Sequence, residues 1–384
     1  MAEVCYDTCV GGNNMLKKFE VQNFMGFKDN FIFDLTTNKK YASNSDMVEK
    51  NTIKKALIFG ANSSGKSNLC SALMDITFHL VDKEKLLIPN NIYLNAENNT
   101  PNAIFKYHFV FGKKRVVYEY AKKSCLELCY EKLYVNDELL LEYNYFDYSH
   151  NVIKLPGTEN LNKIQLQQQL SMIKYIYSNT LQKEDSIVKQ LVEFVNGMLY
   201  FKSLLEGNRY MGFRLGSDDL SSIILNKNKL ADFQDFLRDM GLNYSLVPIR
   251  NVAGLPAIGV RYSSDKVIEF SQVISSGTKT LWLFYCWLLE FEKVKFLVID
   301  EFDAYYHYDL SLKVLKMVNS YTNLQSVITT HTTFLMRKEV TRPDCCFIIN
   351  NNSKVSPICK LTKREIRESN NLEKMYREGE FVEF

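Results

Sequence analysis

The chain has 384 residues, and its 47 Lys and Arg residues nearly balance its 44 Asp and Glu residues, so a formal net charge of +3 excludes a molecule dominated by charge of one sign. Hydrophobic residues make up 46% of the chain, which is enough for a large core and excludes a disordered protein. The longest apolar stretch, Leu281 to Phe291, is interrupted by Glu290 and is shorter than the ~20 residues that span a bilayer. The N-terminus lacks a secretory signal pattern, so we expect a cytoplasmic protein without a membrane partner.

The nine cysteines are an odd number without CxxC spacing, so we expect reduced thiols buried in the core. A minor alternative is half of a zinc site, formed by one of two cysteine pairs together with a histidine. Cys125 and Cys129 fall on one face of an alternating strand, which favours small buried apolar residues instead. The residues of this alternative are Cys5 with Cys9, Cys125 with Cys129, and His108 or His150.

Strands open the folded part of the chain, after a tail over residues 1–15 that has no periodic pattern. The run LKKFEVQNF from Leu16 predicts a first strand, Phe31 to Leu35 a second, and KKALIF a third that ends at Gly60. From Lys66 the apolar residues follow helical spacing, at Leu69, Leu73, Ile76 and Leu80. The order is therefore strand, glycine-rich loop, helix.

The middle of the chain changes pattern twice. From Ile104 to Tyr148 the period is two, with turn residues at Gly112-Lys113 and Asn136-Asp137, which predicts an antiparallel β section. Residues 159–243 return to helical spacing and predict a helical insertion, for instance at Ile187, Leu191, Phe194 and Met198.

After Pro248 strands and helices alternate again. The pattern predicts a helix from Lys279 to Phe291, a fully apolar strand (VKFLVID), a helix from Asp309 and a last strand (SVITTH). Alternation of buried strands and helices predicts an α/β fold with a mostly parallel sheet that is covered on both faces.

A phosphate-binding loop is predicted at Gly60-Ala61-Asn62-Ser63-Ser64-Gly65-Lys66-Ser67, which matches G-x-x-x-x-G-K-[ST]. Because the loop follows a strand and opens a helix, its backbone N–H groups can bind phosphates. We expect Lys66 to pair with the β and γ oxygens of ATP and the Ser67 hydroxyl to bind Mg²⁺.

The Walker B pattern Phe296-Leu-Val-Ile-Asp300-Glu301 is the second half of such a site. Asp300, at the strand end, is predicted to hold Mg²⁺, and Glu301 to accept a proton from the attacking water. The alternative is a buried strand that ends in two solvent-facing carboxylates.

Two further motifs indicate the family: Ile274-Ser275-Ser276-Gly277-Thr278 before a helix, and Thr329-Thr330-His331 at the end of the last strand. With them the sequence resembles ABC-type ATPases of the SMC, RecF and overcoming-lysogenisation-defect group, above all the AAA ATPases of bacterial anti-phage and abortive-infection systems. The resemblance covers about 16–83 and 244–380. The matching segments are Gly60 to Asn68, Asn23 to Asp29, Asp300 to Asp303 with His307, and Asn371 to Tyr376 with Gly379.

This resemblance implies a homodimer in which two ATP molecules lie between opposed protomers. Ser275, Ser276 and Gly277 would approach the γ-phosphate held by the other protomer, although a plain helix N-cap is the alternative for these residues. It also implies that His331 senses the γ-phosphate and that Asp303 communicates across the interface. The implied ATP-binding set is Gly60, Ala61, Asn62, Ser63, Ser64, Gly65, Lys66, Ser67, Asn68, Ser275, Ser276, Gly277 and Asp303, with Lys66, Glu301 and His331 as catalytic residues.

Two departures from the family pattern predict slow or partner-dependent ATP hydrolysis. No glutamine lies between Asn68 and Ile164, so the family's glutamine that contacts Mg²⁺ and water has no counterpart there. The family's arginine after Asn-Phe is Met25.

The predicted domains are a tail (1–15), a first ATPase part (16–83), the antiparallel β section (84–158), the helical insertion (159–243) and a second ATPase part (244–384). The fold class is a P-loop, ABC-type ATPase head with these two additions.

Three functions remain open at this point. The first is an ATP-driven sensor of a phage-defence system that controls a separately encoded effector, either a nuclease or a toxin. The others are a DNA-repair ATPase that clamps DNA and an ATP-binding scaffold with little turnover. The chain after His331 is too short for a fused nuclease module, so we expect the effector in trans, with DNA or a phage component as a further partner. The clusters considered for phosphate-backbone contact are Lys54-Lys55, Lys113-Lys114-Arg115 and Lys122-Lys123.

Overall fold

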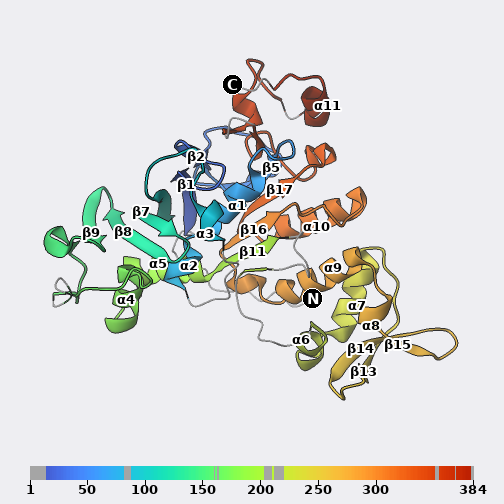
Figure 1. Cartoon of the computed structure of the whole chain (residues 1–384). Helices are drawn as coiled ribbons and strands as arrows, with labels where there is room; N and C mark the ends of the chain where they lie inside the picture. The colour runs from blue at the N-terminus through green and yellow to red at the C-terminus, as the bar shows by residue number, and fades with distance from the viewer. Residues whose placement is uncertain are drawn as a thin grey trace.

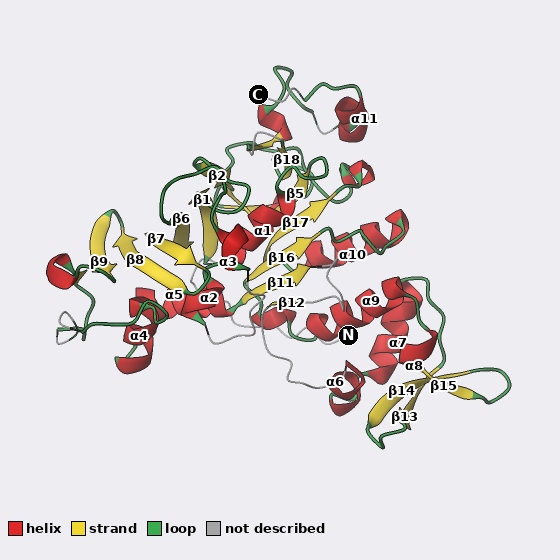
Figure 2. Cartoon of the chain, viewed as in Figure 1, coloured by secondary structure: helices red, strands yellow, loops and turns green. Residues whose placement is uncertain are grey.

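The computed structural model describes residues 14–81, 88–159, 161, 164–202, 210–211, 220–350, 354–367 and 369–381. Within these residues two seven-stranded sheets make up most of the fold (Figures 1 and 2). In both views one sheet lies to the left and the other runs through the centre, and a small sheet lies at the lower right. No described helix is long and apolar enough to cross a bilayer.

The first large sheet is antiparallel and has the order β10-β9-β8-β7-β6-β1-β2. Its inward side chains alternate with outward ones, as the period of two predicts. Two of its turns have left-handed backbone at the predicted turn residues, Gly112 (φ 60°) and Asn136 (φ 48°). The strands are β1 (Met15–Gln22), β2 (Phe31–Asp34), β6 (Ala103–Phe111), β7 (Lys114–Ser124), β8 (Glu127–Val135), β9 (Glu138–Asn144) and β10 (Val152–Ile153).

The second large sheet has the order β12-β11-β16-β17-β5-β18-β19, and its five inner strands are parallel. The predicted fold class is therefore confirmed: a mostly parallel sheet flanked by helices, with an added antiparallel section. Strand β17 lies between β16 and β5, so three carboxyl ends meet at one edge. The strands are β5 (Lys55–Phe59), β11 (Met198–Lys202), β12 (Tyr210–Met211), β16 (Phe296–Asp300), β17 (Gln325–Thr330), β18 (Cys346–Ile349) and β19 (Val355–Pro357).

Helices cover both faces of the parallel sheet and enclose two separate cores. Helix α1 (Lys66–Met74) packs in the first core, whereas α9 (Ser276–Leu288) and α10 (Tyr308–Ser320) pack in the second. Strand β16 contributes Phe296 and Val298 to the first core, and its Leu297 and Ile299 to the second. A strand buried on both faces explains the continuous apolar run that precedes Asp300.

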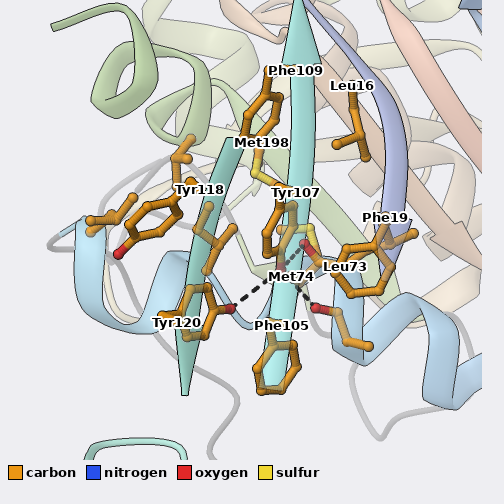
Figure 3. Close-up of a cluster of buried hydrophobic side chains, with 14 of the residues drawn as sticks. Leu16, Phe19, Leu73, Met74, Phe105, Tyr107, Phe109, Tyr118, Tyr120 and Met198 are labelled. Carbon is orange, nitrogen blue, oxygen red and sulfur yellow. Dashed lines mark hydrogen bonds between the residues drawn. The ribbon is translucent and has the colours of Figure 1, made fainter. Parts of the chain in front are cut away.

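The antiparallel sheet packs against α1 through a cluster of buried aromatic side chains (Figure 3). Tyr107 on β6 donates from its hydroxyl to the backbone oxygen of Ala72 on α1 at 2.9 Å, and its hydroxyl lies 3.4 Å from that of Tyr120. The ring centroids of Phe19 and Tyr107 are 4.7 Å apart. The helix that follows the phosphate-binding loop is thereby anchored to the antiparallel sheet.

The structure differs from the predicted elements in three places. Strands β1 and β2, grouped in the sequence with the strand before Gly60, belong to the antiparallel sheet, where β1 pairs with β6 and β2 pairs with β1. Helix α1 ends at Met74, where Asp75 and Thr77 hydrogen-bond to carbonyls of the last turn, and α2 (Thr77–Leu80) follows.

The third difference lies in segment 159–243, which is not wholly helical. Helix α5 (Ile187–Asn196) ends at Gly197, so Met198 begins strand β11 instead of continuing the helix. Gly197 was the signal for this break, because glycine is the commonest residue after a helix C-terminus. The other helices of the segment are α4 (Met172–Asn179), α6 (Leu220–Asn226) and α7 (Leu230–Asp239).

The remaining elements are short. The small sheet consists of β13 (Leu246–Arg250), β14 (Pro256–Arg261) and β15 (Val267–Glu269), followed by α8 (Phe270–Val273). The others are β3 (Val48–Glu49), β4 (Thr52–Ile53), α3 (Asn90–Tyr93) and α11 (Leu372–Arg377).

Candidate nucleotide-binding site

The phosphate-binding loop, residues 60–67, connects the carboxyl end of β5 to the N-terminus of α1. A Cβ atom at Gly60 would lie 2.7 Å from the backbone oxygen of Ile349, so only glycine fits there. Gly65 is the N-cap residue of α1 and has φ 103°, in the left-handed region that favours glycine. Both motif glycines are therefore required sterically, and the loop leads into the positive end of a helix dipole.

Lys66 lies buried inside this loop. Its Nζ donates to the backbone oxygens of Gly60 at 2.9 Å and Ala61 at 2.8 Å. Burial lowers the pKa of Lys66, while the carboxylates of Glu301 and Asp300 act in the opposite direction. The structure thus brings the predicted lysine and the two predicted carboxylates into one site.

Thr329 on β17 orients the end of β16. Asp300 is buried, and its Oδ1 accepts a hydrogen bond from the Thr329 Oγ1 at 2.7 Å. The same Oγ1 accepts from the backbone N–H of Glu301 at 2.8 Å. The role of Thr329 is not evident from its motif, although its place at the end of a neighbouring parallel strand is a signal for it.

Glu301 and His331 face each other at the edge of the sheet. The Oε1 of Glu301 lies 3.4 Å from the Nε2 of His331, and these side chains are 21% and 38% exposed. Glu301 has φ 50°, a left-handed conformation that is strained for this residue type. Beside them, Thr332 donates from its hydroxyl to the carboxylate of Asp303. The carboxylates of Glu301 and Asp303 therefore both contact the loop that follows β17.

The Ser275-Ser276-Gly277 motif forms the start of α9. The Ser275 Oγ accepts from the backbone N–H of Thr278 at 3.2 Å, so Ser275 is a helix N-cap. Ser276 is exposed. A Cβ atom at Gly277 would lie 2.7 Å from the backbone oxygen of Tyr305, in the loop that follows β16.

The two halves of the predicted site lie on different faces of the sheet within one chain. Helix α1 packs in one core and α9 in the other. Among the described residues no hydrogen bond joins Ser275, Ser276 or Gly277 to residues 60–68.

The segment around Met25 borders the phosphate-binding loop. A Cβ atom at Gly26 would lie 2.4 Å from the amide nitrogen of Asn68, and the ring of Phe27 lies against Gly65. Met25 has φ 47°, and its backbone N–H donates to the oxygen of Tyr93 at 3.0 Å. The segment around Met25, which resembles the family, therefore lies beside the start of α1.

The residues present fit a magnesium–nucleotide complex. Ser67 and Asp300 offer hydroxyl and carboxylate oxygens, which are the donors that Mg²⁺ prefers. The Ser64 Oγ is buried and has no hydrogen-bond partner among the described residues. A lysine, a helix N-terminus and this unpaired hydroxyl form a cradle that suits phosphate oxygens.

The zinc alternative has no support in the described part of the chain, where no group of three His, Cys, Asp or Glu side chains is placed to hold a metal ion. The seven cysteines described there form no disulfide, and Cys125 lies in a turn instead of a strand. His108 contacts Glu20 at 2.7 Å. Cys5 and Cys9 lie outside the described residues.

Part of the predicted basic clusters lies inside the protein, whereas Lys113, Arg115 and Lys123 are exposed. Lys54, Lys55 and Lys122 are buried, and the Nζ of Lys55 donates to the backbone oxygens of Val318 and Tyr321 at the end of α10. The ammonium groups of these three lysines therefore donate hydrogen bonds to groups within the protein.

Solved structures with a similar fold include the SMC head domain from Thermotoga maritima (15% identity, TM-score 0.41, 89% of this chain and 97% of that chain). Others are an SMC head bound to the C-terminal winged-helix domain of ScpA (15%, 0.46, 89% and 96%) and the Pyrococcus furiosus SMC head with an extended coiled coil bound to the C-terminal domain of ScpA (12%, 0.45, 89% and 95%). A search of curated protein sequences finds no match.

A protein-family model described as "AAA domain, putative AbiEii toxin, Type IV TA system" matches residues 55–337. This range begins at β5 and extends beyond His331, so it includes the phosphate-binding loop, the start of α9 and the carboxylates after β16. With its P-loop, its mostly parallel sheet and this match over most of its length, the chain belongs to that AAA domain family of P-loop ATPases.

Proposed function

We propose that the protein is an ATP-hydrolysing ABC-type ATPase that acts as the sensor and regulatory subunit of an anti-phage defence system and controls a separately encoded effector. The observation that supports ATP hydrolysis best is the convergence of Lys66, Asp300 and Glu301 at one edge of the sheet, with Glu301 beside His331. The family's link to abortive-infection toxins supports the defence role.

In the proposed reaction each residue acts at a defined atom. The Nζ of Lys66 exchanges the carbonyls of Gly60 and Ala61 for phosphate oxygens. Ser67 and Asp300 would hold Mg²⁺, which supplies charge neutralisation at the phosphates when bound. A carboxylate oxygen of Glu301 takes a proton from the attacking water, and the Nε2 of His331 holds the same carboxylate in place.

The composite site of an ATP-sandwich dimer is part of this proposal. Because Ser275 and Ser276 are exposed and begin a helix on the face opposite α1, they are available to a second copy of the chain. A helix N-terminus with serine hydroxyls suits a phosphate anion. Asp303, held by Thr332, would lie near the same contact.

An effector in trans is proposed to bind the antiparallel sheet. Three large apolar side chains are exposed at one end of it: Leu126 (42%), Phe146 (54%) and Leu170 (37%), which we call the distal patch. The segments that carry them are neighbours, because the N–H of Leu128 donates to the oxygen of Gln168 and the Tyr145 hydroxyl donates to the oxygen of Leu170, both at 2.9 Å. Exposed apolar clusters of this kind are typical of protein-binding sites.

The distal patch gives a direct test of this role. The double variant Leu126→Ser/Phe146→Ser should weaken association with the product of the adjacent gene by about 10-fold or more. It should also abolish protection in a phage plaque assay while leaving basal ATPase activity within about twofold of wild type. Val252→Ser, which alters a fully exposed apolar residue in the loop between β13 and β14, is the matched control and should change neither.

Two results would contradict this assignment. One is wild-type protection by the double variant. The other is a nuclease activity of the purified chain alone that the double variant abolishes. Salt-dependent binding of duplex DNA at physiological ionic strength would favour the DNA-clamp alternative.

A further inference from the structure

Tyr200 on β11 has a buried hydroxyl without a partner. The residue is 2% exposed, and among the described residues no group forms a hydrogen bond with its oxygen. An unpaired hydroxyl in a protein interior costs about 1–3 kcal/mol. Such a group therefore calls for a ligand or a functional reason.

The position of Tyr200 follows from the sheet register. Strand β11 runs parallel to β16, and Tyr200 lies opposite Val298. Both residues belong to the core on the α1 side of the sheet. Since alternate residues of a strand share a face, Asp300 lies on that side too, two residues beyond Val298.

The Tyr200 hydroxyl lies near Asp300, one of the two residues predicted to hold Mg²⁺. Burial raises the pKa of Tyr200, and the carboxylate of Asp300 raises it further, followed by Cys70. The side chain of Ser71, on α1, acts in the opposite direction and lowers this pKa, so it lies near the phenol oxygen, although the two form no hydrogen bond. The phenol thus remains protonated, and it can donate a hydrogen bond into the space between α1 and Asp300.

We propose that Tyr200 is a positioning residue of the nucleotide site, whose hydroxyl donates to a water bound to the Mg²⁺ that Ser67 and Asp300 hold. The inference rests on the proposed function, because it needs a magnesium–nucleotide complex at this site. Residues that hydrogen-bond to the ligands of a metal orient those ligands without binding the metal themselves. Loss of such a residue commonly weakens metal binding 10- to 100-fold.

The Tyr200→Phe variant tests this role because it removes a single oxygen atom. Binding of a fluorescent ATP analogue is measured while Mg²⁺ is titrated, together with the Tm of the nucleotide-free protein. The variant should need about 10-fold more Mg²⁺ for half-maximal enhancement of nucleotide binding, and its affinity in EDTA should equal that of wild type. Its nucleotide-free Tm should rise, because an unpaired buried hydroxyl is gone.

Tyr143→Phe is the matched control. The Tyr143 hydroxyl donates to the backbone oxygen of Ile164 at 2.9 Å, so this variant should lower the Tm and leave the Mg²⁺ dependence unchanged. A wild-type Mg²⁺ dependence in Tyr200→Phe would overturn the inference and leave the proposed ATPase intact, and so would an equal loss of affinity in EDTA. Failure of the wild-type chain to bind nucleotide would instead refute the proposed function.

Discussion

The Glu301→Gln variant should bind ATP as tightly as wild type and hydrolyse it about 100- to 10,000-fold more slowly. Glutamine keeps the shape of glutamate but cannot accept the proton of the attacking water. The contact of Glu301 with the Nε2 of His331 at 3.4 Å shows that the carboxylate faces the edge of the sheet. Single-turnover phosphate release and calorimetric ATP binding measure the two effects separately.

Lys66→Ala should behave differently, because it removes the ammonium group proposed to bind phosphate oxygens. Its nucleotide affinity should fall together with its turnover. Glu292→Gln is the control. It changes an exposed glutamate that precedes the amino end of β16, at the end of the sheet away from the phosphate-binding loop, and should leave nucleotide affinity and turnover unchanged. Wild-type turnover by Glu301→Gln would show that another group accepts the proton.

The second large effect concerns a buried ion pair that joins α1 to the antiparallel sheet. Asp75, directly after α1, accepts hydrogen bonds from the Nζ of Lys122 at 2.7 Å and from the hydroxyls of Tyr93 and Tyr120, both at 2.9 Å. The side chains of Asp75 and Lys122 are fully buried. Burial lowers the pKa of Lys122, and Asp75 opposes this shift.

Asp75→Ala should lower the free energy of unfolding by about 3–5 kcal/mol, because it leaves the ammonium group of Lys122 buried without its partner. The double variant Asp75→Leu/Lys122→Met removes both charges and should recover most of this loss. Urea unfolding measures both effects. Asp235→Ala, which breaks the exposed pair with Arg238 on α7, is the control and should change stability by less than about 1 kcal/mol. A double variant less stable than Asp75→Ala would show that the pair itself, and not the unpaired charge, determines the loss.

The sequence predicted the elements whose residues follow a single local rule. The glycines of the phosphate-binding loop, the apolar strand before Asp300 and the alternating strands from β6 to β9 were all recognisable, because sterics, burial on both faces and a period of two leave direct patterns. Apolar spacing alone predicts a helix through Met198, because it does not distinguish the end of a buried helix from the start of a buried strand.

Contacts between distant segments could not be predicted in this way. The pairing of β1 with β6 joins residues about 80 to 95 positions apart, and sequence patterns do not encode the partner of a strand. The link from Thr329 to Asp300 depends on β17 lying beside β16, which only the sheet order reveals. Lys54, Lys55 and Lys122 looked like surface charges because their buried partners come from other elements.

Mixing two inactive variants tests the proposed sandwich dimer, in which each ATP site combines residues of two protomers. Lys66→Ala damages the phosphate-binding loop, and Ser276→Arg damages the exposed start of α9, so every homodimer of either variant has two defective sites. In a heterodimer both lesions fall in one composite site and the other site is intact. An equal mixture should recover roughly a quarter of wild-type ATPase activity if the two sites act independently, because about half of the dimers are mixed. No recovered activity, together with no ATP-dependent dimer in sedimentation, would contradict the sandwich dimer.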